Sequence, residues 1–245
     1  MALRLLNRQF SQRKEVIDAL SQVQLLVHDT DVEVFTKIRK SLDNLRAVIA
    51  RLAIAEAPDP DDYIKIDETF NLLTNVLVNG MKAGSVKEQY QTLMMNLDAG
   101  GVGLSFFKAT KGVQGTRSTK RDLEGAKMAV HRFFQAFNIS NKAIQSTMFD
   151  HLSTFVQQVK ELAEASRTLM SIFKDNADLC SQLDSDQIQM IIDAIHVHGK
   201  SVLSMELLQM LVKPSEECLI PVATLVIDHL SSADCEDLLV LYHFD

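Results

Sequence analysis

The sequence is poor in the residues that mark several structural classes. Its 245 residues include no tryptophan, nine glycines and four prolines. Such a composition excludes a collagen-like chain and a disordered one. No run of eighteen apolar residues occurs, and the N-terminus lacks the order of charged, apolar and small residues that forms a secretory signal. We therefore expect a soluble, non-secreted protein.

Cysteine and histidine are also too few, and wrongly spaced, for the common metal sites. Cys180, Cys218 and Cys235 are odd in number, without a C-x-x-C pair or a histidine at zinc-finger distance. We predict buried free thiols in a reducing compartment. His196 and His198 are two residues apart, so they do not share one side of a helix. A packed or capping role is predicted for both, and no metal ligand.

Catalytic and cofactor motifs are missing as well. No Gly-x-Ser-x-Gly elbow or His-Glu-x-x-His helix is present, so we predict no catalytic residue and no enzyme. Gly100-Gly101-Val102-Gly103 has no preceding strand and no following Gly-Lys-Ser/Thr, and the sequence implies no bound cofactor. Pro58 to Asp62 lacks the glycine and glutamate of an EF-hand, which favours an interhelical turn. A net charge of −7 disfavours nucleic acid and favours protein partners.

What is present is helical periodicity, clearest between Asp184 and Tyr242. Ile188, Ile191, Ile192 and Ile195 recur at the spacing of a one-sided helix. The next two segments, 202–212 and 219–230, are apolar on most of their circumference. Each would therefore be covered on more than one side by other helices. A layered helical stack is predicted.

The rest of the chain continues this pattern. Further helices are predicted at 4–27, 30–52, 61–81, 85–97, 123–137, 141–159 and 162–174. Caps are expected at Thr30 or Asp31, at Ser140 or Asn138, and at Ser185. The first two helices form either a helical hairpin within the stack or a two-helix coiled coil. The predicted fold class is all-α, an armadillo-like α-solenoid of stacked antiparallel helices, although no internal repeat is sharp in the sequence.

The pattern changes between Asp98 and Arg121. Residues 108–121 carry five basic side chains and no acidic one. This composition indicates a flexible linker, with a basic docking arm as the alternative. We accordingly predict an N-terminal helical segment (1–108), a basic flexible linker (109–121) and a C-terminal helical domain (122–245).

From Ala129 onward, six short stretches occur in an order and at spacings that resemble a known family. The stretches are 132–137 (RFFQAF), 141–145 (NKAIQ), 150–155 (DHLSTF), 176–180 (NADLC), 198–202 (HGKSV) and 236–242 (EDLLVLY). They resemble the ryanodine and inositol 1,4,5-trisphosphate receptor homology (RIH) domain, and are most similar to the inositol-trisphosphate receptor branch. Pro221 and Lys200 depart from that pattern, and Pro221 puts the straightness of its helix in doubt.

The resemblance implies a cytosolic solenoid segment of a tetrameric calcium-release channel of the endoplasmic reticulum or another internal membrane. Its partners would be other domains or subunits of that channel. The family's β-trefoil inositol-phosphate site and its pore have no counterpart here, so no ligand, calcium or catalytic residue is carried over, and no membrane insertion is implied. The apolar run 238–244 ends without a covering helix, so we expect a domain truncated at its C-terminal end. The alternative is a free-standing armadillo-like scaffold that binds a peptide or helix.

Overall fold

The computed structural model describes residues 29–55, 59–82, 86–113, 116–199 and 201–231. Within these ranges the chain is entirely helical, with no strand, which confirms the predicted all-α class. The helix predicted at 4–27 and the run 238–244 lie outside the described residues, as does Ser85. The choice between hairpin and coiled coil therefore stays open.

The helices differ in length, from 4 to 24 residues, and follow one another closely along the chain. They are α2 (Asp29–Leu52), α3 (Pro60–Lys82), α4 (Val86–Asn96), α5 (Ala99–Ala109), α6 (Arg117–Asn138), α7 (Lys142–Phe149), α8 (Leu152–Glu161), α9 (Ser166–Phe173), α10 (Ala177–Cys180), α11 (Ser185–His196), α12 (Val202–Val212) and α13 (Ile220–Leu230), with a 3₁₀ turn, η1 (Ala163–Ala165), before α9.

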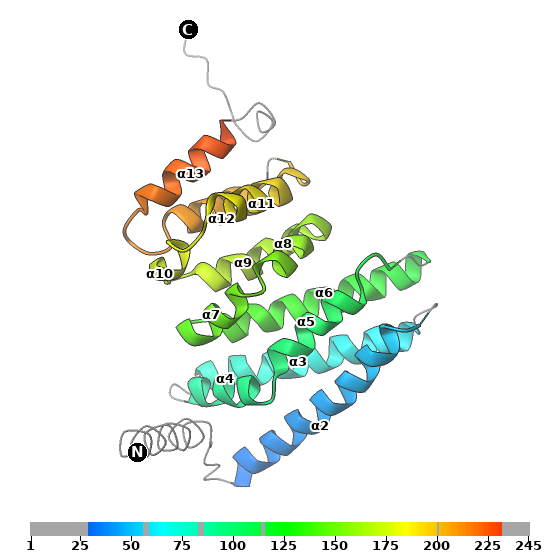
Figure 1. Ribbon diagram of the computed structural model, residues 1–245. Helices are drawn as coiled ribbons and strands as arrows, with labels where there is room; N and C mark the ends of the chain where they lie inside the picture. The colour runs from blue at the N-terminus through cyan, green and yellow to red at the C-terminus, as the bar shows by residue number, and fades with distance from the viewer. Residues whose placement is uncertain (1–28, 56–58, 83–85, 114–115, 200, 232–245) are drawn as a thin grey trace, which may run out of the picture.

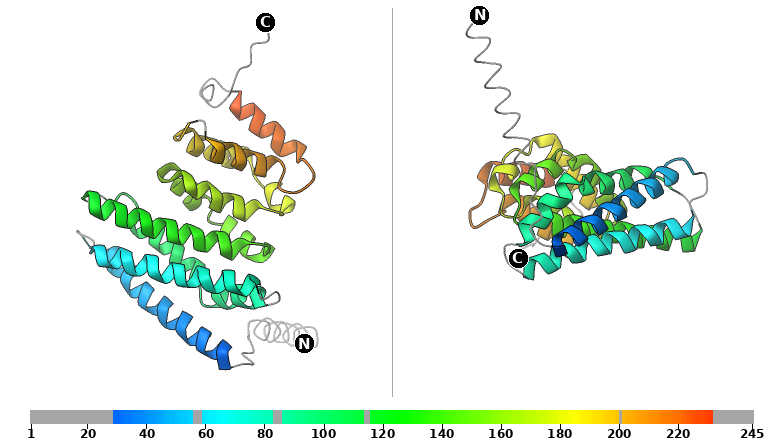
Figure 2. Two further views of the ribbon diagram at one scale, coloured as in Figure 1. Left: turned by 180° about the vertical axis from the view of Figure 1, so that it is seen from behind. Right: turned by 90° about the horizontal axis from the view of Figure 1, so that it is seen from below.

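The helices stack in two rows, as Figures 1 and 2 show. In the first row α3, α6, α9 and α12 each pack on the next. In the second row α2, α5, α8, α11 and α13 do the same. The shorter α4, α7 and α10 join one first-row helix to the following second-row helix. A unit of three helices thus repeats as α4–α5–α6, α7–α8–α9 and α10–α11–α12, which is the armadillo-like solenoid that the sequence predicted.

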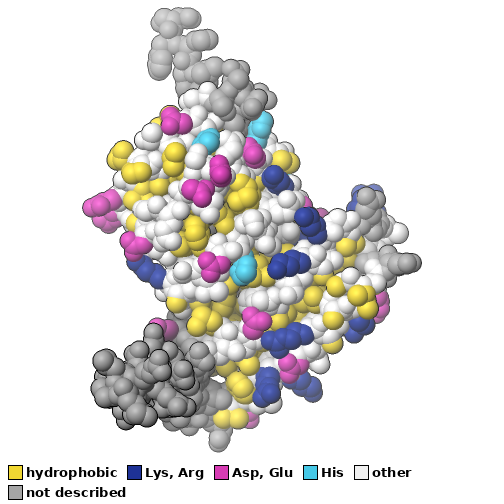
Figure 3. Space-filling view, in the orientation of Figure 1, with side chains coloured by type: hydrophobic (Ala, Val, Ile, Leu, Met, Phe, Trp, Pro, Cys, Tyr) yellow, Lys and Arg dark blue, Asp and Glu magenta, His cyan; other side chains and the backbone are white. Residues whose placement is uncertain are grey.

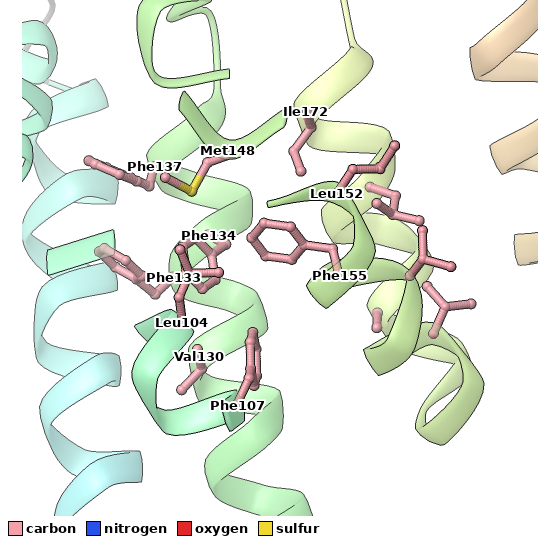
Figure 4. Close-up of a cluster of buried hydrophobic side chains, with 14 of the residues drawn as sticks. Leu104, Phe107, Val130, Phe133, Phe134, Phe137, Met148, Leu152, Phe155 and Ile172 are labelled. Carbon is pink, nitrogen blue, oxygen red and sulfur yellow. The ribbon is translucent and has the colours of Figure 1, made fainter. Parts of the chain in front are cut away.

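Phenylalanine rings fill the centre of the stack (Figure 4). Phe134 of α6 meets Phe155 of α8 edge to face, with ring centroids 5.0 Å apart, and lies 6.0 Å from Phe107 of α5. Phe133 stacks on Phe137 at 5.2 Å. All five rings are buried. Aromatic pairs at these distances add to the stabilisation from burial alone, so they fasten neighbouring layers together.

The glycine-rich stretch is the largest departure from the predicted helices. Instead of the start of an irregular region, it forms α5. A Cβ atom at Gly103 would lie 2.8 Å from Cζ of Phe134, and one at Gly100 would lie 3.2 Å from Cε of Met148. These glycines therefore let α5 approach its neighbours closely, which outweighs their poor helix propensity.

The helix after the glycines begins earlier than predicted. The sequence predicts a basic flexible linker over residues 109–121, but α6 starts at Arg117, with Thr116 as its N-cap. The described linker is thus shorter than expected. Division of the chain at this point stays a prediction, although α3 and α6, on either side of it, pack side by side along much of their length.

Several helix ends also differ from the prediction. The helix expected at 141–159 is interrupted at residues 150–151 and forms α7 and α8. Asn141 caps α7 in place of Ser140 or Asn138, and Asp184 caps α11 in place of Ser185. Helix α2 already begins at Asp29, so the expected caps Thr30 and Asp31 lie inside it.

The C-terminal helices are less covered than their apolar sequences suggested. Pro221 lies in the first turn of α13, where a proline is tolerated, so it does not bend the helix. Ile220 and Ile227 of α13 are 68% and 61% exposed, and Met205 of α12 is 54% exposed. Each helix still packs on two others, as predicted for 202–212 and 219–230: α12 contacts α9 and α13, and α13 contacts α11 and α12. The exposed side chains lie on the part of each helix that these contacts leave uncovered.

Candidate functional site

A buried glutamine of α4 ties this helix to the ends of two others. Nε2 of Gln91 donates to the carbonyl oxygens of Phe137 and Ile139, at 2.8 and 3.0 Å, where α6 ends. Its Oε1 accepts from Nδ2 of Asn141 at 3.3 Å. The other side-chain atom of Asn141, Oδ1, caps α7 by accepting from the backbone N–H of Ile144. One polar chain therefore joins α4, the end of α6 and the start of α7.

The next layer repeats this arrangement. Nε2 of Gln145, in α7, donates to the carbonyl oxygens of Ser171 and Lys174, at 3.1 and 2.9 Å, around the end of α9. Its Oε1 accepts from Nδ2 of Asn176 at 2.9 Å, and Oδ1 of Asn176 accepts from the N–H of Leu179 at the start of α10. We call these two networks the glutamine clamps.

The turns before the two capping asparagines share one backbone conformation. Ser140 and Asp175 have φ values of 55° and 57°. This left-handed conformation costs a non-glycine residue about 1–2 kcal/mol, and both turns retain it. In the second turn the N–H of Asp175 also donates to the carbonyl oxygen of Pro214 at 3.0 Å, which extends the contact to the end of α12.

The glutamines themselves are almost inaccessible to solvent. Gln91 and Gln145 are 2% and 1% exposed, yet both ends of each amide have partners. A buried amide that is fully hydrogen-bonded is favourable, whereas removing one partner leaves the others unsatisfied at about 1–3 kcal/mol. Each clamp therefore resists separation of its helices and fixes their relative position.

Further polar contacts join α6 to the layer above it. Nδ1 of His131 lies 3.0 Å from Oγ1 of Thr168, which also lies 3.4 Å from the carbonyl oxygen of His131, and Nδ2 of Asn138 donates to Oγ of Ser171 at 3.0 Å. Lys127 forms an ion pair with Glu161.

His131 is held in the neutral state. Burial, and secondarily the positive charge of Lys127, lowers its pKa to about 3. Its ring stacks on Phe107 with centroids 4.8 Å apart, and its Nε2 has no hydrogen-bond partner in the described structure. A charged imidazole here would be desolvated beside an ammonium group, so the contact between α6 and α9 requires the neutral form.

The sequence predicts packing roles for two histidines and buried states for the cysteines, and the structure agrees for all of those it describes except Cys218. His198 hydrogen-bonds through Nε2 to the carbonyl oxygen of Val159 and so ties the turn after α11 to α8, while His196 is half-buried. Burial raises the pKa of the Cys180 thiol to about 12. Cys218 is exposed, so the prediction of a buried thiol is wrong there. Cys235 lies outside the described residues.

The turn around Pro58 to Asp62 is used for local charge pairing. Oδ1 of Asp62 accepts from Arg51 at 2.6 Å and lies 3.4 Å from Nζ of Lys65, while Oδ1 of Asp59 accepts from the N–H of Asp61. No cluster of three or more His, Cys, Asp or Glu side chains suited to a metal ion occurs in the described ranges. Among those residues no helix is both long and apolar enough to cross a membrane.

Sequence reasoning did not find the glutamine clamps. One signal was available: Gln91 and Gln145 are polar residues within the apolar faces of α4 and α7, next to buried Met94 and Ile144. Asn141 and Gln145 are also four residues apart, as are Asn176 and Cys180. Because the third unit has cysteine in place of glutamine, the repeat does not stand out in the sequence.

A protein-family model matches well over half of the chain. The model of the RIH domain matches residues 71–240, from the middle of α3 to beyond α13. The match includes both glutamine clamps and runs across the predicted linker. It also begins well before Ala129, the point after which the six stretches that resemble the family occur. RIH domains occur in receptor channels of the ryanodine and inositol-trisphosphate type and are not an enzyme family, and this chain belongs to the RIH-domain family.

Proposed function

We propose that the chain is a helical-solenoid segment of an inositol 1,4,5-trisphosphate receptor-like calcium-release channel and transmits ligand-induced conformational change toward the pore. It would act at the cytosolic face of the endoplasmic reticulum or another internal membrane. Its partners would be other domains or subunits of a tetrameric channel. Membership of the RIH family supports the channel, and the inositol-trisphosphate branch rests on the six sequence stretches that resemble it.

The observation that carries the transmitting role is the pair of glutamine clamps. In a solenoid, each layer contacts only its neighbours, so a displacement at one end reaches the other only through successive interlayer contacts. Burial and dispersion hold the layers together but are non-directional, so they fix the register between two helices less strictly than hydrogen bonds do. Hydrogen bonds are directional, and those of Gln91 and Gln145 hold each short helix in one position on the preceding layer. Transmission with little loss requires such contacts.

The test is to weaken a clamp in the channel subunit that carries this segment. Gln145→Leu retains much of the volume but leaves the carbonyls of Ser171 and Lys174 and the amide of Asn176 without their partner, at a cost of about 1–3 kcal/mol. We expect ligand binding at its distant site to persist while the ligand concentration for half-maximal calcium release rises. Gln91→Leu is expected to act in the same way.

The matched control is Gln182→Leu. Gln182 is exposed and donates only to the carbonyl of Asp178 within its own turn, so this change should leave calcium release unaltered. Ligand binding and release are measured on the same membranes, and thermal unfolding of the isolated segment reports the loss of stability. If Gln145→Leu lowers stability while release keeps its normal dependence on ligand, the clamps only stabilise the fold and do not transmit.

A further inference from the structure

The second row of helices carries three adjoining hollows. The first, of about 720 Å³, lies between α2 and α5, and the second, of about 360 Å³, between α5, α8 and α11. Both are lined by Lys108 and Lys111. The third, of about 450 Å³, lies between α7, α8 and α11 and shares Ser153 and Met190 with the second. Because each hollow shares residues with the next, we treat them together as the second-row groove.

The charge of the second-row groove changes along its length. Lys108 and Lys111 line its first two hollows, are exposed and form no ion pair among the described residues; the first hollow also contains one further basic and one acidic side chain, Arg46 and Asp98. The third hollow contains Asp150, Asp184 and Asp186. Figure 3 shows acidic side chains gathered over the upper part of this face, and most of the basic side chains, with some acidic ones among them, over its lower part and right edge. One end of the groove therefore attracts carboxylates and the other attracts ammonium or guanidinium groups.

A buried amide lines the middle of the groove. Gln158 of α8 is 2% exposed, yet its Oε1 has no hydrogen-bond partner in the described structure. A buried acceptor without a donor is unfavourable, and most such groups in proteins are satisfied. The backbone N–H of an extended chain is a suitable donor, because an extended chain that is not in a sheet has free N–H groups.

These features select one class of partner. A polyanion, such as a nucleic acid or a phosphoinositide headgroup cluster, would be attracted by Lys108 and Lys111 but repelled by Asp150 and Asp186. A small ligand would occupy only one of the hollows. The distance from α2 to α11 comprises three interhelical steps of about 9 Å each, which corresponds to about eight residues of extended chain.

We propose that the second-row groove binds an extended peptide segment of another protein, about eight residues long, with acidic side chains at one end and basic side chains at the other. The acidic end lies in the first hollow, between α2 and the pair Lys108 and Lys111, a backbone N–H faces Gln158, and the basic end lies on Asp150 and Asp186. This interaction surface is additional to the transmitting role and does not depend on it.

The test uses labelled nine-residue peptides and fluorescence anisotropy at low ionic strength, with this chain as the receptor. One peptide has three glutamates at one end and three lysines at the other. A second has the same six charged residues in alternation, and a third and fourth carry six glutamates or six lysines. We expect the segregated peptide to bind at least about tenfold more tightly than the alternating one, because only the segregated peptide matches both ends of the groove.

Charge reversal locates the binding. Lys108→Glu/Lys111→Glu should weaken binding of the segregated peptide by about tenfold or more, and so should Asp150→Lys/Asp186→Lys. Lys37→Glu/Lys120→Glu is the matched control, since both lysines are exposed, neither lines the groove, and the change in net charge equals that of the first variant. Circular dichroism checks that each variant is folded.

Four results would overturn the proposal. The first three are absence of binding by the segregated peptide, equal binding of the segregated and alternating peptides, and an equal loss of binding in the Lys37→Glu/Lys120→Glu control. Tightest binding of the six-glutamate peptide would instead show a site for polyanions and would equally reject a segregated partner. None of these results bears on the glutamine clamps, whose test measures calcium release.

Discussion

Helices α5 and α13 have the same length but opposite relations between sequence and burial. Helix α5 contains three glycines, yet seven of its eleven residues are buried. Helix α13 is rich in isoleucine, leucine and valine, yet only Val222 and Val226 are buried among its eleven residues. The first lies between α2, α6 and α8, whereas the second lies at the end of the described stack. In a solenoid, burial is therefore set by the position of a layer as much as by its hydrophobicity.

The largest expected effect is the difference in unfolding free energy between removing a central aromatic ring and removing a terminal side chain. Phe134 is fully buried and contacts the rings of Phe107, Phe133 and Phe155, so Phe134→Ala should lower the free energy of unfolding by about 3–5 kcal/mol. Ile227 is 61% exposed, so Ile227→Ala should cost less than about 1 kcal/mol. Urea unfolding of both variants measures the difference. Equal costs would show that the α13 layer is as tightly packed as the centre.

The second prediction uses pH to act on a central layer through His131. The fold holds His131 neutral with its pKa lowered from 6.5 to about 3, so its contribution to stability is complete above pH 6.5 and is lost as the pH falls toward 3. Between pH 7 and pH 5 this loss amounts to about 2 kcal/mol. His131→Phe should remove this component of the pH dependence, because phenylalanine does not titrate.

A histidine of the terminal helix provides the control for that experiment. His229 of α13 contacts Ser185 through Nε2, and His229→Phe should leave the loss of stability between pH 7 and pH 5 in place. Chemical unfolding at several pH values measures both variants. A wild-type protein whose stability is the same at pH 7 and pH 5 would contradict the neutral, buried state of His131.

The two rows of long helices could be predicted from sequence because their apolar residues follow the helical period. The stripe of α2, with buried Ile38, Leu42, Leu45, Ile49 and Leu52, is an example. Helix α5 could not, because glycine lowers helix propensity by about 1 kcal/mol per residue and the compensating contacts of Gly103 and Gly100 are with Phe134 and Met148, far along the chain. The break between α7 and α8 was missed for a related reason: Asp150 and His151 are not strong helix breakers, and the change of direction is fixed by packing.

The site was harder to predict than the fold. Gln91 and Asn141 are 50 residues apart, and nothing in either local sequence identifies the other as its partner. The RIH resemblance indicated the family but assigned no residue to a contact. The second-row groove is likewise invisible in sequence, since Lys108 and Asp186 belong to segments that come together only when α5, α8 and α11 stack.

The smallest expected effect comes from the same substitution at two glycines. At Gly103 an added Cβ would lie 2.8 Å from Cζ and 2.9 Å from Cε2 of Phe134, a ring that is itself fully enclosed and has no room to move. The resulting overpacking costs about 1–3 kcal/mol, from which the better helix propensity of alanine recovers about 1. We therefore expect Gly103→Ala to destabilise by about 1 kcal/mol.

At Gly125, on the exposed side of α6, no atom lies within 4 Å of the added Cβ. Gly125→Ala should therefore stabilise the protein by about 0.5–1 kcal/mol, through propensity and a smaller entropy loss on folding. The two variants share one chemistry, so the difference in sign isolates the close approach of α5 to α6. If both substitutions were stabilising, α5 would pack loosely and its glycines would not be required for the contact. If both were destabilising, the cost would lie outside that contact, since Gly125 has no neighbour to displace.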